Sequence, residues 1–467
     1  MLYKLISSFT TSPSPDFRRG FGGEEVNIFC LKGENKMTFN ALKEKGLPLE
    51  KQVRTWHDIA HRKYNKNEVD CYSRTRQILM NGIEVEAWNF KHNFARLCQD
   101  EDTLEFLAQT KRIEDAQQTT INWLAPCDQS VLETTLGYEQ VAVDLTAWMA
   151  QNEPDPYVKE TFDFGLLEDF DHLYRYSQWA YMIHGITPNA VVQGQTDVIL
   201  GRPTQNHHNC NIVRLRKHYD KATATPQTKV NILTLVAGEQ QTHNYYGEHG
   251  FAYGSELLRE TYAEIKDVEE EHVTMYESLI DPSESFYEKL LLHEFTEVCT
   301  YHNCMTDEKD EMLMPIWEEF LAMELDHLQT AAKLFKKYEK RDPEEVIGTD
   351  IVHPCHFTSQ KAYVEEVLRA EIDKRLGSDK DYQFTKDIPD DWASYWVQET
   401  AGKDGSPSEV TIRVIAEQKN RDLVCANEKL KSDLPKLAKK SIQQKGMTCD
   451  TVTPEEYEKM SKEEFEL

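Results

Sequence analysis

The sequence lacks the signatures of several common protein classes. Its 467 residues include 10 cysteines but no Cys-x-x-Cys pair, which argues against a rubredoxin-like iron site, a zinc ribbon and a thioredoxin motif. No run of about 18 apolar residues occurs, so we expect no membrane span. Lys and Arg number 53 against 81 Asp and Glu, for a net charge of −28. Because no basic stripe is present, nucleic-acid binding through phosphate contacts is not expected.

The first residues also lack the features expected of a secretory signal. The first 36 residues are rich in Ser, Pro and Gly but have neither a clean apolar core nor a small-residue cleavage site. Met37 opens the first segment that resembles folded protein, so residues 1–50 are interpreted as a flexible extension or, in part, as an over-long gene start. The cysteine count is low for this length and does not indicate a disulfide scaffold, which favours a reducing cytoplasm.

Glycine and proline are scarce inside long stretches of the chain, and strand-like alternation is hard to find. Turn-forming residues gather in short clusters such as "NEPDP" (152–156), "IDPSES" (280–285) and "KRDPEEVIGTD" (340–350). The segments between clusters run for roughly 20–30 residues with helical periodicity, which is the length of bundle helices. We therefore predict an all-α protein.

A tandem repeat organises the acidic residues. A shift of 155 residues superposes Glu84 on Glu239, Glu114 on Glu269, Glu139 on Glu294, Asp169 on Glu324 and His172 on His327. Within each copy the acids step by 30, 25 and 30 residues. A step of 30 fits half a helix, a turn and half a helix back, so paired acids lie at the same level of a hairpin. The repeat predicts two tandem four-helix bundles.

The predicted helices carry these acids on their apolar faces. In residues 313–334, Glu324 and His327 share one helical stripe with Leu, Trp, Phe and Ala, whereas Asp326 lies off it. A buried carboxylate costs several kcal/mol unless it is neutralised, paired or bound to metal. Each bundle is expected to bury four acids, and we expect no Lys or Arg on the stripes to pair with them. Metal cations would balance the charge.

This pattern resembles the ferritin-like di-iron carboxylate superfamily, in which two helices of a four-helix bundle each supply a Glu and the other two each supply Glu-x-x-His. The second copy contains the full set: Glu239, Glu269, His272, Glu294, Glu324 and His327. The resemblance implies that Glu269 and Glu324 bridge two metal ions. It also implies that Glu239 and Glu294 are terminal ligands and that each His binds one metal. Glu297, one turn beyond Glu294, is an additional or alternative ligand.

The ligand types indicate which metal to expect. Hard carboxylates with imidazole suit Fe or Mn, and an open coordination position would admit O2 or peroxide. The resemblance therefore implies a pair of Fe ions as cofactor, with Mn as the alternative.

The first copy departs from this pattern. Its corresponding residues are Glu84, Glu114, Glu139, Asp169 and His172. Gln117 stands where the second copy has His272, and Asp169 is shorter than the Glu it replaces. The first site is therefore predicted to bind weakly, to hold one metal or to be vestigial. Ferritin-like bundles usually cross over between helices two and three, for which a 25-residue step leaves little chain, so a crossover and an up-down-up-down order both remain open.

These observations predict five regions along the chain. They are an extension (1–50), a first ferritin-like bundle with a degraded site (51–190), a linker (191–225), a second ferritin-like bundle with the di-metal site (226–345) and a partly irregular C-terminal extension (346–467).

The resemblance implies an oxidoreductase that activates O2 or peroxide in the second bundle, with a small organic molecule or peroxide as substrate. Without a rubredoxin module, its electrons would come from an external donor. The alternatives are an iron-binding or ferroxidase storage-type protein and a non-catalytic helical scaffold with vestigial sites. The assembly state is left open, with a homodimer as one option.

A few other residues are of types that can bind metals, and we interpret most of them as having no metal-binding role. The loops "HPCH" (353–356) and "HHNC" (207–210) are interpreted as polar loops rather than as a second metal site. The pairs Asp58/His61 and Asp350/His353 are interpreted as surface pairs. His243 is either an outer partner of the metal site or an ordinary buried His. Five tyrosines are interpreted as bundle core rather than redox-active groups: Tyr245, Tyr246, Tyr262, Tyr276 and Tyr301.

Overall fold

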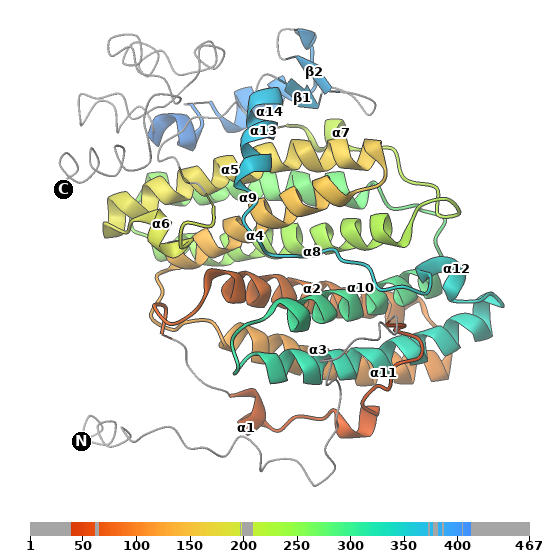
Figure 1. Ribbon diagram of the computed structural model, residues 1–467. Coiled ribbons are helices and arrows are strands. Elements are labelled where there is room, and N and C mark those ends of the chain that lie inside the picture. Colours follow the sequence, from red (N-terminus) through yellow and green to blue (C-terminus); the bar gives the residue numbers. More distant parts are fainter. Residues whose placement is uncertain are drawn as a thin grey trace, which may run out of the picture. The chain divides into compact units, whose positions relative to one another are not determined.

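The computed structural model describes residues 39–60, 65–196, 198, 209–371, 374–376, 382–384, 387–403 and 405–411. Helices dominate this part of the chain, as predicted (Figure 1). The long helices are α2 (Cys71–Leu97), α3 (Glu101–Trp123), α4 (Val131–Asn152), α5 (Pro156–His184), α8 (Pro226–His249), α9 (Glu256–Glu277), α10 (Phe286–Asp307) and α11 (Met314–Glu339). None of the described helices is both long and apolar enough to span a bilayer.

Shorter elements connect and follow the long helices. They are η1 (Leu49–Lys51), α1 (Trp56–Ile59), α6 (Pro188–Val191), α7 (Asn211–Arg214), η2 (Gly250–Ala252), α12 (Glu344–Ile347), α13 (Lys361–Glu371), β1 (Lys374–Leu376), β2 (Tyr382–Phe384) and α14 (Tyr395–Ala401). The two strands pair antiparallel, with Lys374 opposite Phe384. Of the predicted extension at 1–50, residues 1–38 lie outside the described residues.

Capping residues fix where the long helices begin. Ser130 and Ser285 each accept a hydrogen bond from the backbone N–H three residues on, and the Glu carboxylate at that position accepts one from the backbone N–H of the capping Ser. These two capping boxes are related by the 155-residue shift, so the repeat preserves local structure as well as acids. The C-terminal end of α5 is set by Gly185, which has φ 65°. This left-handed conformation favours glycine and ends the helix.

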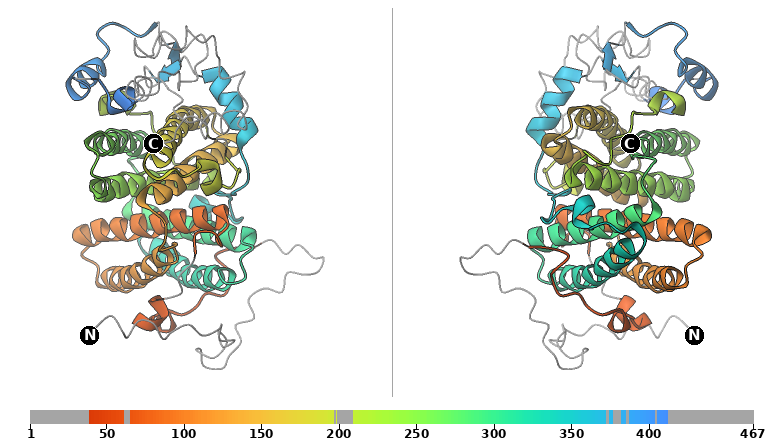
Figure 2. Two further views of the ribbon diagram at one scale, coloured as in Figure 1. Left: turned by 90° about the vertical axis from the view of Figure 1, so that its left-hand side faces the viewer. Right: turned by 90° about the vertical axis from the view of Figure 1, so that its right-hand side faces the viewer.

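The long helices form four antiparallel hairpins: α2–α3, α4–α5, α8–α9 and α10–α11. The hairpins stack so that α5 lies beside α9, α4 beside α8, α2 beside α10 and α3 beside α11 (Figures 1 and 2). We call the set α4, α5, α8 and α9 the central bundle, because it is formed by one stretch of chain. We call the set α2, α3, α10 and α11 the split bundle, because the central bundle interrupts it in sequence.

This grouping differs from the predicted one. The sequence repeat was expected to give one bundle per copy, whereas each bundle in the structure combines one hairpin from each copy. Loop length excludes one alternative. Residues 124–130 can span at most roughly 25 Å, less than the roughly 33 Å length of the 22-residue α4. A single copy therefore cannot form a bundle with a crossover, although this loop would allow an up-down-up-down bundle. The structure adopts neither, and α4 packs beside α2 and α8 instead.

The structure also answers which helix order each bundle adopts. Residues 185–225 connect α5 to α8 and give the central bundle a long crossover between its second and third helices. In the split bundle the whole central bundle serves as that connection. Both bundles thus have two hairpins joined by a long crossover, and neither is a simple up-down-up-down bundle.

Asp144 on α4 makes the fold's stability depend on pH. Burial raises the pKa of this carboxyl to about 8 despite a hydrogen bond from Thr196; Thr196 Oγ1 donates to Asp144 Oδ2 over 3.1 Å. The folded chain then holds a proton that the unfolded chain has lost between about pH 4 and pH 8. The free energy of unfolding therefore falls with rising pH in that window, by at most about 1.4 kcal/mol per pH unit for this group.

Asp144→Asn should remove this dependence, because the amide cannot ionise. We expect the variant to gain stability over the parent steadily from pH 5 to pH 8, as measured by chemical unfolding at several pH values. Asp267→Asn, at a carboxylate 72 % exposed, is the matched control. A gain that is the same at every pH would contradict the assignment.

Candidate metal centre

Six ligand-type side chains meet inside the central bundle, one or two from each helix. They are Glu139 on α4, Asp169 and His172 on α5, Glu239 on α8, and Glu269 and His272 on α9. All six are at most 2 % exposed. Each helix turns them inward because they share its apolar stripe, as the sequence predicted. We call this group the central cluster.

Glu269 is the residue that both halves of the central cluster share. Ligand atoms of Asp169, Glu239, Glu269 and His272 lie within 4.8 Å of one another, and so do those of Glu139, His172 and Glu269. Glu269 Oε1 lies 2.9 Å from His172 Nδ1, and its Oε2 lies 3.3 Å from His272 Nδ1. The two oxygens of one carboxylate thus face two different histidines, which suits a carboxylate that bridges two cations.

Several buried atoms of the central cluster have no hydrogen-bond partner among the described residues. They are Glu139 Oε2, Asp169 Oδ1 and Glu239 Oε2, whereas Glu269 Oε2 and His272 Nδ1 face each other over 3.3 Å without hydrogen-bond geometry. No Lys or Arg in the described part of the chain forms an ion pair with these four carboxylates. Buried polar atoms without partners are rare in folded proteins and require an explanation. A bound cation is one such explanation, because it would pair with several of these atoms at once.

The pKa values of the central cluster show how strongly its charges interact. Burial raises the pKa of Glu139 and Asp169 well above the ordinary carboxyl value, and neighbouring carboxylates add to the rise. Burial also raises the pKa of Glu239 to about 7. For His272, burial would lower the pKa, but Glu239 and Glu168 outweigh it and hold the pKa well above 6.5. The chain's own groups therefore balance the charge by retaining protons that divalent cations would displace.

A second layer of side chains orients the central cluster. His272 Nε2 lies 2.8 Å from Glu168 Oε2, which turns the other ring nitrogen toward the acids. Arg214 holds Glu168 in place, with Nη2 2.8 Å from Glu168 Oε1, and it also pairs with Glu271 over 3.1 Å. A carboxylate behind a histidine is the usual arrangement around metal-binding histidines. The sequence pattern did not predict Glu168 or Arg214, because both lie off the repeated acid positions.

No family model, curated protein or solved structure matches the chain. The chemistry of the two bundles is therefore judged from their own side chains.

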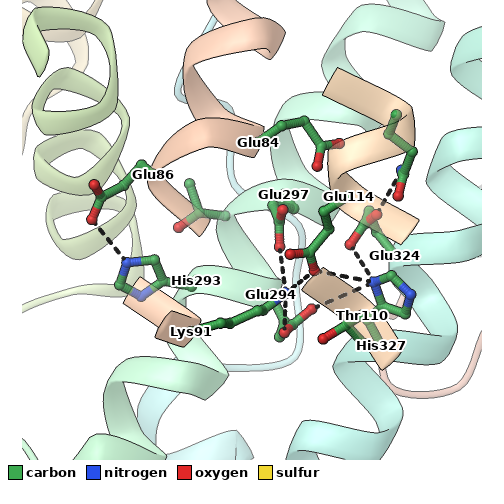
Figure 3. Close-up of polar contacts among 12 residues, drawn as sticks. Glu84, Glu86, Lys91, Thr110, Glu114, His293, Glu294, Glu297, Glu324 and His327 are labelled. Atoms are coloured by element: carbon green, nitrogen blue, oxygen red, sulfur yellow. Dashed lines mark hydrogen bonds and ion pairs between the residues drawn. The ribbon is translucent and has the colours of Figure 1, made fainter. Parts of the chain in front are cut away.

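The split bundle holds a second acidic group, which we call the split cluster. Its members are Glu84 on α2, Glu114 and Gln117 on α3, Glu294 and Glu297 on α10, and Glu324 and His327 on α11. Figure 3 labels all of them except Gln117. Ligand atoms of Glu114, Glu294, Glu324 and His327 form one group within 4.8 Å, and those of Glu84, Glu297 and Glu324 form another. Glu324 is shared here, as Glu269 is in the central cluster.

Lys91 on α2 distinguishes the split cluster. It is fully buried, and its ammonium pairs with Glu114, with Glu294 over 2.8 Å and with Glu297 over 3.9 Å (Figure 3). The expectation that no Lys or Arg lies on the acid stripes is therefore wrong. Lys91 follows Glu84 by seven residues, two helical turns, so its place on the same face was readable from the spacing.

Hydrogen bonds hold Glu324 and His327 of the split cluster in place. Gln117 Nε2 donates to Glu324 Oε1 over 2.8 Å, and His327 Nδ1 lies 2.9 Å from Glu324 Oε2. The other ring nitrogen of His327 lies 2.7 Å from Gln52 Oε1. Gln117 thus contacts the shared carboxylate through its amide, where the central cluster has a histidine. Gln52 had no signal in the sequence pattern, because it lies outside the repeat.

The 155-residue shift relates the two clusters in detail. It superposes Lys91 on Tyr246 and Glu294 on Glu139. Lys91 pairs with Glu294, and the Tyr246 hydroxyl donates to Glu139. The same position therefore contacts the same acid in both bundles, as an ammonium in one and as a neutral hydroxyl in the other. The split cluster has a built-in cation that the central cluster lacks.

The structure divides the predicted ligand set between the two bundles. Glu239, Glu269 and His272 belong to the central cluster, whereas Glu294, Glu324 and His327 belong to the split cluster. The predicted pairing of Glu269 with Glu324 as bridging residues is therefore corrected: within each bundle Glu269 is opposite Asp169, and Glu324 is opposite Glu114. Asp169 and His172, expected in a degraded site, complete the group that has two histidines.

The other candidates have plainer surroundings. His243 is partly exposed and its Nε2 lies 3.9 Å from Glu270, so it is neither buried nor next to the central cluster. His353 contacts Asn303 over 2.7 Å, and His356 contacts Asp307 over 2.5 Å. Among the described residues, these loop histidines join no candidate metal group. His61 and residues 207–208 of the "HHNC" loop lie outside the described residues.

The predicted core tyrosines are largely confirmed. Tyr246, Tyr262, Tyr276 and Tyr301 are buried, and Tyr245 is partly buried. Two of them also contact the acids, since Tyr246 donates to Glu139 and Tyr301 donates to Glu84.

Proposed function

We propose that the central bundle binds two metal ions and that the chain is a non-haem di-iron carboxylate oxidoreductase of the ferritin-like kind. The observation that supports this most directly is the sharing of Glu269 by two ligand groups, each with its own histidine and its own Glu. Carboxylate oxygens with one imidazole per metal suit Fe, with Mn as the alternative.

Each residue of the central cluster has a role in this proposal. Asp169, Glu239, Glu269 and His272 would hold one ion, and Glu139, His172 and Glu269 would hold the other. Glu168 fixes the ring of His272 from behind, and the Tyr246 hydroxyl fixes one oxygen of Glu139. Buried Tyr176 and Tyr262 lie beside Tyr246 and exclude water from this end of the cluster.

The proposed reaction is the activation of O2 or peroxide. Two ferrous ions, when bound, supply two electrons, enough to reduce O2 to H2O2 with two protons or H2O2 to two waters. A small organic molecule or peroxide is the proposed substrate. The electrons would be restored by an external donor, because the chain has no Cys-x-x-Cys that could form a rubredoxin-type centre.

The test is a ferrous titration of the metal-free chain under anaerobic conditions. We expect about two tightly bound irons per chain, followed by O2 consumption and a change in near-ultraviolet absorption when O2 is admitted. Uptake of many irons per chain would favour storage instead. No uptake of Fe or Mn above background would reject the proposal and favour a non-catalytic scaffold.

A further inference from the structure

A cleft rich in side-chain amides lies where the two bundles meet. Its walls come from α2 and α3 of the split bundle and from α4 and α8 of the central bundle, and its volume is about 490 Å³. This size is typical of sites for small molecules. Side-chain amides dominate the lining, among them Gln77, Asn81, Gln118, Asn122, Gln241 and Asn244.

Gln77 marks this cleft as a built binding site. Its side chain is 3 % exposed, yet neither amide atom has a hydrogen-bond partner in the described part of the chain. The nearby Arg74 is 4 % exposed, and its Nε is likewise without a partner among the described residues. A buried amide without hydrogen bonds costs roughly 1–3 kcal/mol. A ligand that both donates and accepts hydrogen bonds would remove that cost.

The lining also indicates the charge of the ligand. Arg74 and Glu248 are the ionised side chains among the described lining residues, and their charges cancel. Arg74 is further engaged by its own protein, since Nη2 donates to Gln140 Oε1 over 3.2 Å and to the Val191 carbonyl over 2.6 Å. Amides pair equally well with donors and acceptors. The cleft therefore suits a neutral molecule with several hydroxyl groups.

Aromatic rings supply an apolar face to the same cleft. Tyr138 and Tyr245 stack with ring centroids 4.2 Å apart and planes at 17°, and Trp88 also lines the cleft. Amides beside ring faces fit a compound that combines hydroxyl edges with a C–H face, as a sugar or cyclic polyol does.

A small void lies between the cleft and the central cluster. It measures about 10 Å³, shares Ile78, Tyr138 and Gln241 with the cleft, and is lined by Glu239. That volume is close to what one water molecule needs. Gln241 stands between the two spaces and donates to the Tyr138 hydroxyl over 2.9 Å.

Gly82 allows Gln241 to occupy this position. A Cβ at residue 82 would lie 2.2 Å from Gln241 Oε1 and 3.0 Å from the Ala237 carbonyl oxygen. The glycine therefore lets α2 and α8 approach closely beside Gln241.

We propose that the cleft binds a neutral polyhydroxylated small molecule and presents it to the central cluster past Gln241. The binding part stands on the cleft alone, and the presentation part rests on the proposed di-iron function. The two parts are tested separately, because binding can be measured without metal.

The binding test uses the metal-free full-length chain and calorimetry with D-glucose and myo-inositol, beside glucose 6-phosphate and adenosine. We expect one neutral polyol to bind and the phosphate ester to bind at least tenfold more weakly. Gln77→Leu should weaken the polyol at least tenfold while leaving the melting temperature unchanged or higher, because an apolar isostere relieves the unpaired amide. Gln109→Leu, at an exposed amide on α3, is the matched control and should change nothing.

Some results would overturn the inference. Binding of neither polyol, equal binding to Gln77→Leu, or preference for the phosphate ester or the nucleoside would each reject a neutral polyol site. For presentation, the bound polyol should change the near-ultraviolet spectrum of the iron-loaded parent and leave that of Gln77→Leu unchanged. If the chain binds polyol but no iron, the polyol site stands and the proposed di-iron function is rejected. If it binds iron but no polyol, the di-iron function stands and the polyol site is rejected.

Discussion

Glu269→Ala should lower the iron content of the chain from about two ions to background. Glu269 is the one residue common to both ligand groups of the central cluster, so its loss removes a ligand from each proposed ion. Glu139→Ala should have a smaller effect, because Glu139 belongs to one group only, and should leave about one ion per chain. The measurement is metal analysis after anaerobic loading with Fe(II) and removal of free metal.

Glu270→Ala is the matched control for this experiment. Its side chain is adjacent in sequence and 49 % exposed, so the same truncation should leave the iron content unchanged. Melting curves of the metal-free variants check that folding is retained. Unchanged iron in Glu269→Ala, with a loss in Glu324→Ala instead, would move the working site to the split bundle and contradict the assignment to the central one.

Lys91→Met should lower the free energy of unfolding of the metal-free chain by about 3–5 kcal/mol, the usual cost of removing one partner from a buried ion pair. The ammonium is fully buried between Glu114 and Glu294, and nearby carboxylates raise its pKa although burial alone would lower it. Without it, five carboxylates would share a buried space. Chemical unfolding of metal-free protein measures the effect.

Two comparisons give this prediction a sharp test. Lys333→Met, at an exposed position on α11, should change stability by no more than about 0.5 kcal/mol. The double variant Lys91→Met/Glu114→Gln should recover part of the loss, because it also removes the closest negative charge. Added Mn(II) should stabilise Lys91→Met more than the parent if the split cluster can accept a metal once its internal cation is gone. A Lys91→Met chain as stable as the parent would refute the role of Lys91 as a counter-ion.

Much of the candidate site was predictable because it depends on local periodicity. The 3.6-residue period places Glu324 and His327 on one apolar stripe and Asp326 off it, and the structure agrees: the first two are buried and Asp326 is partly exposed. The 155-residue shift likewise predicted four acid-bearing hairpins. The same spacing also places Lys91, seven residues after Glu84, on the acid-bearing face of α2, contrary to the expectation that no Lys or Arg lies there.

The sequence by itself determined that this protein is helical, that it repeats and that its repeated acids are buried with histidines beside them. Only the tertiary structure decided which hairpins form a bundle. The reason lies in the repeat: every copy contains one hairpin of each type, so pairing within a copy or between copies gives the same kinds of ligand, and side-chain chemistry cannot distinguish the two. Loop reach excludes a crossover within a copy, because residues 124–130 are too few to return along a bundle, whereas residues 185–225 are enough to join hairpins of different copies. An up-down-up-down bundle within a copy is excluded only by the packing of α4 against α2 and α8. That choice brings Asp169 and His172 to Glu269 and leaves Lys91 with Glu114 and Glu294.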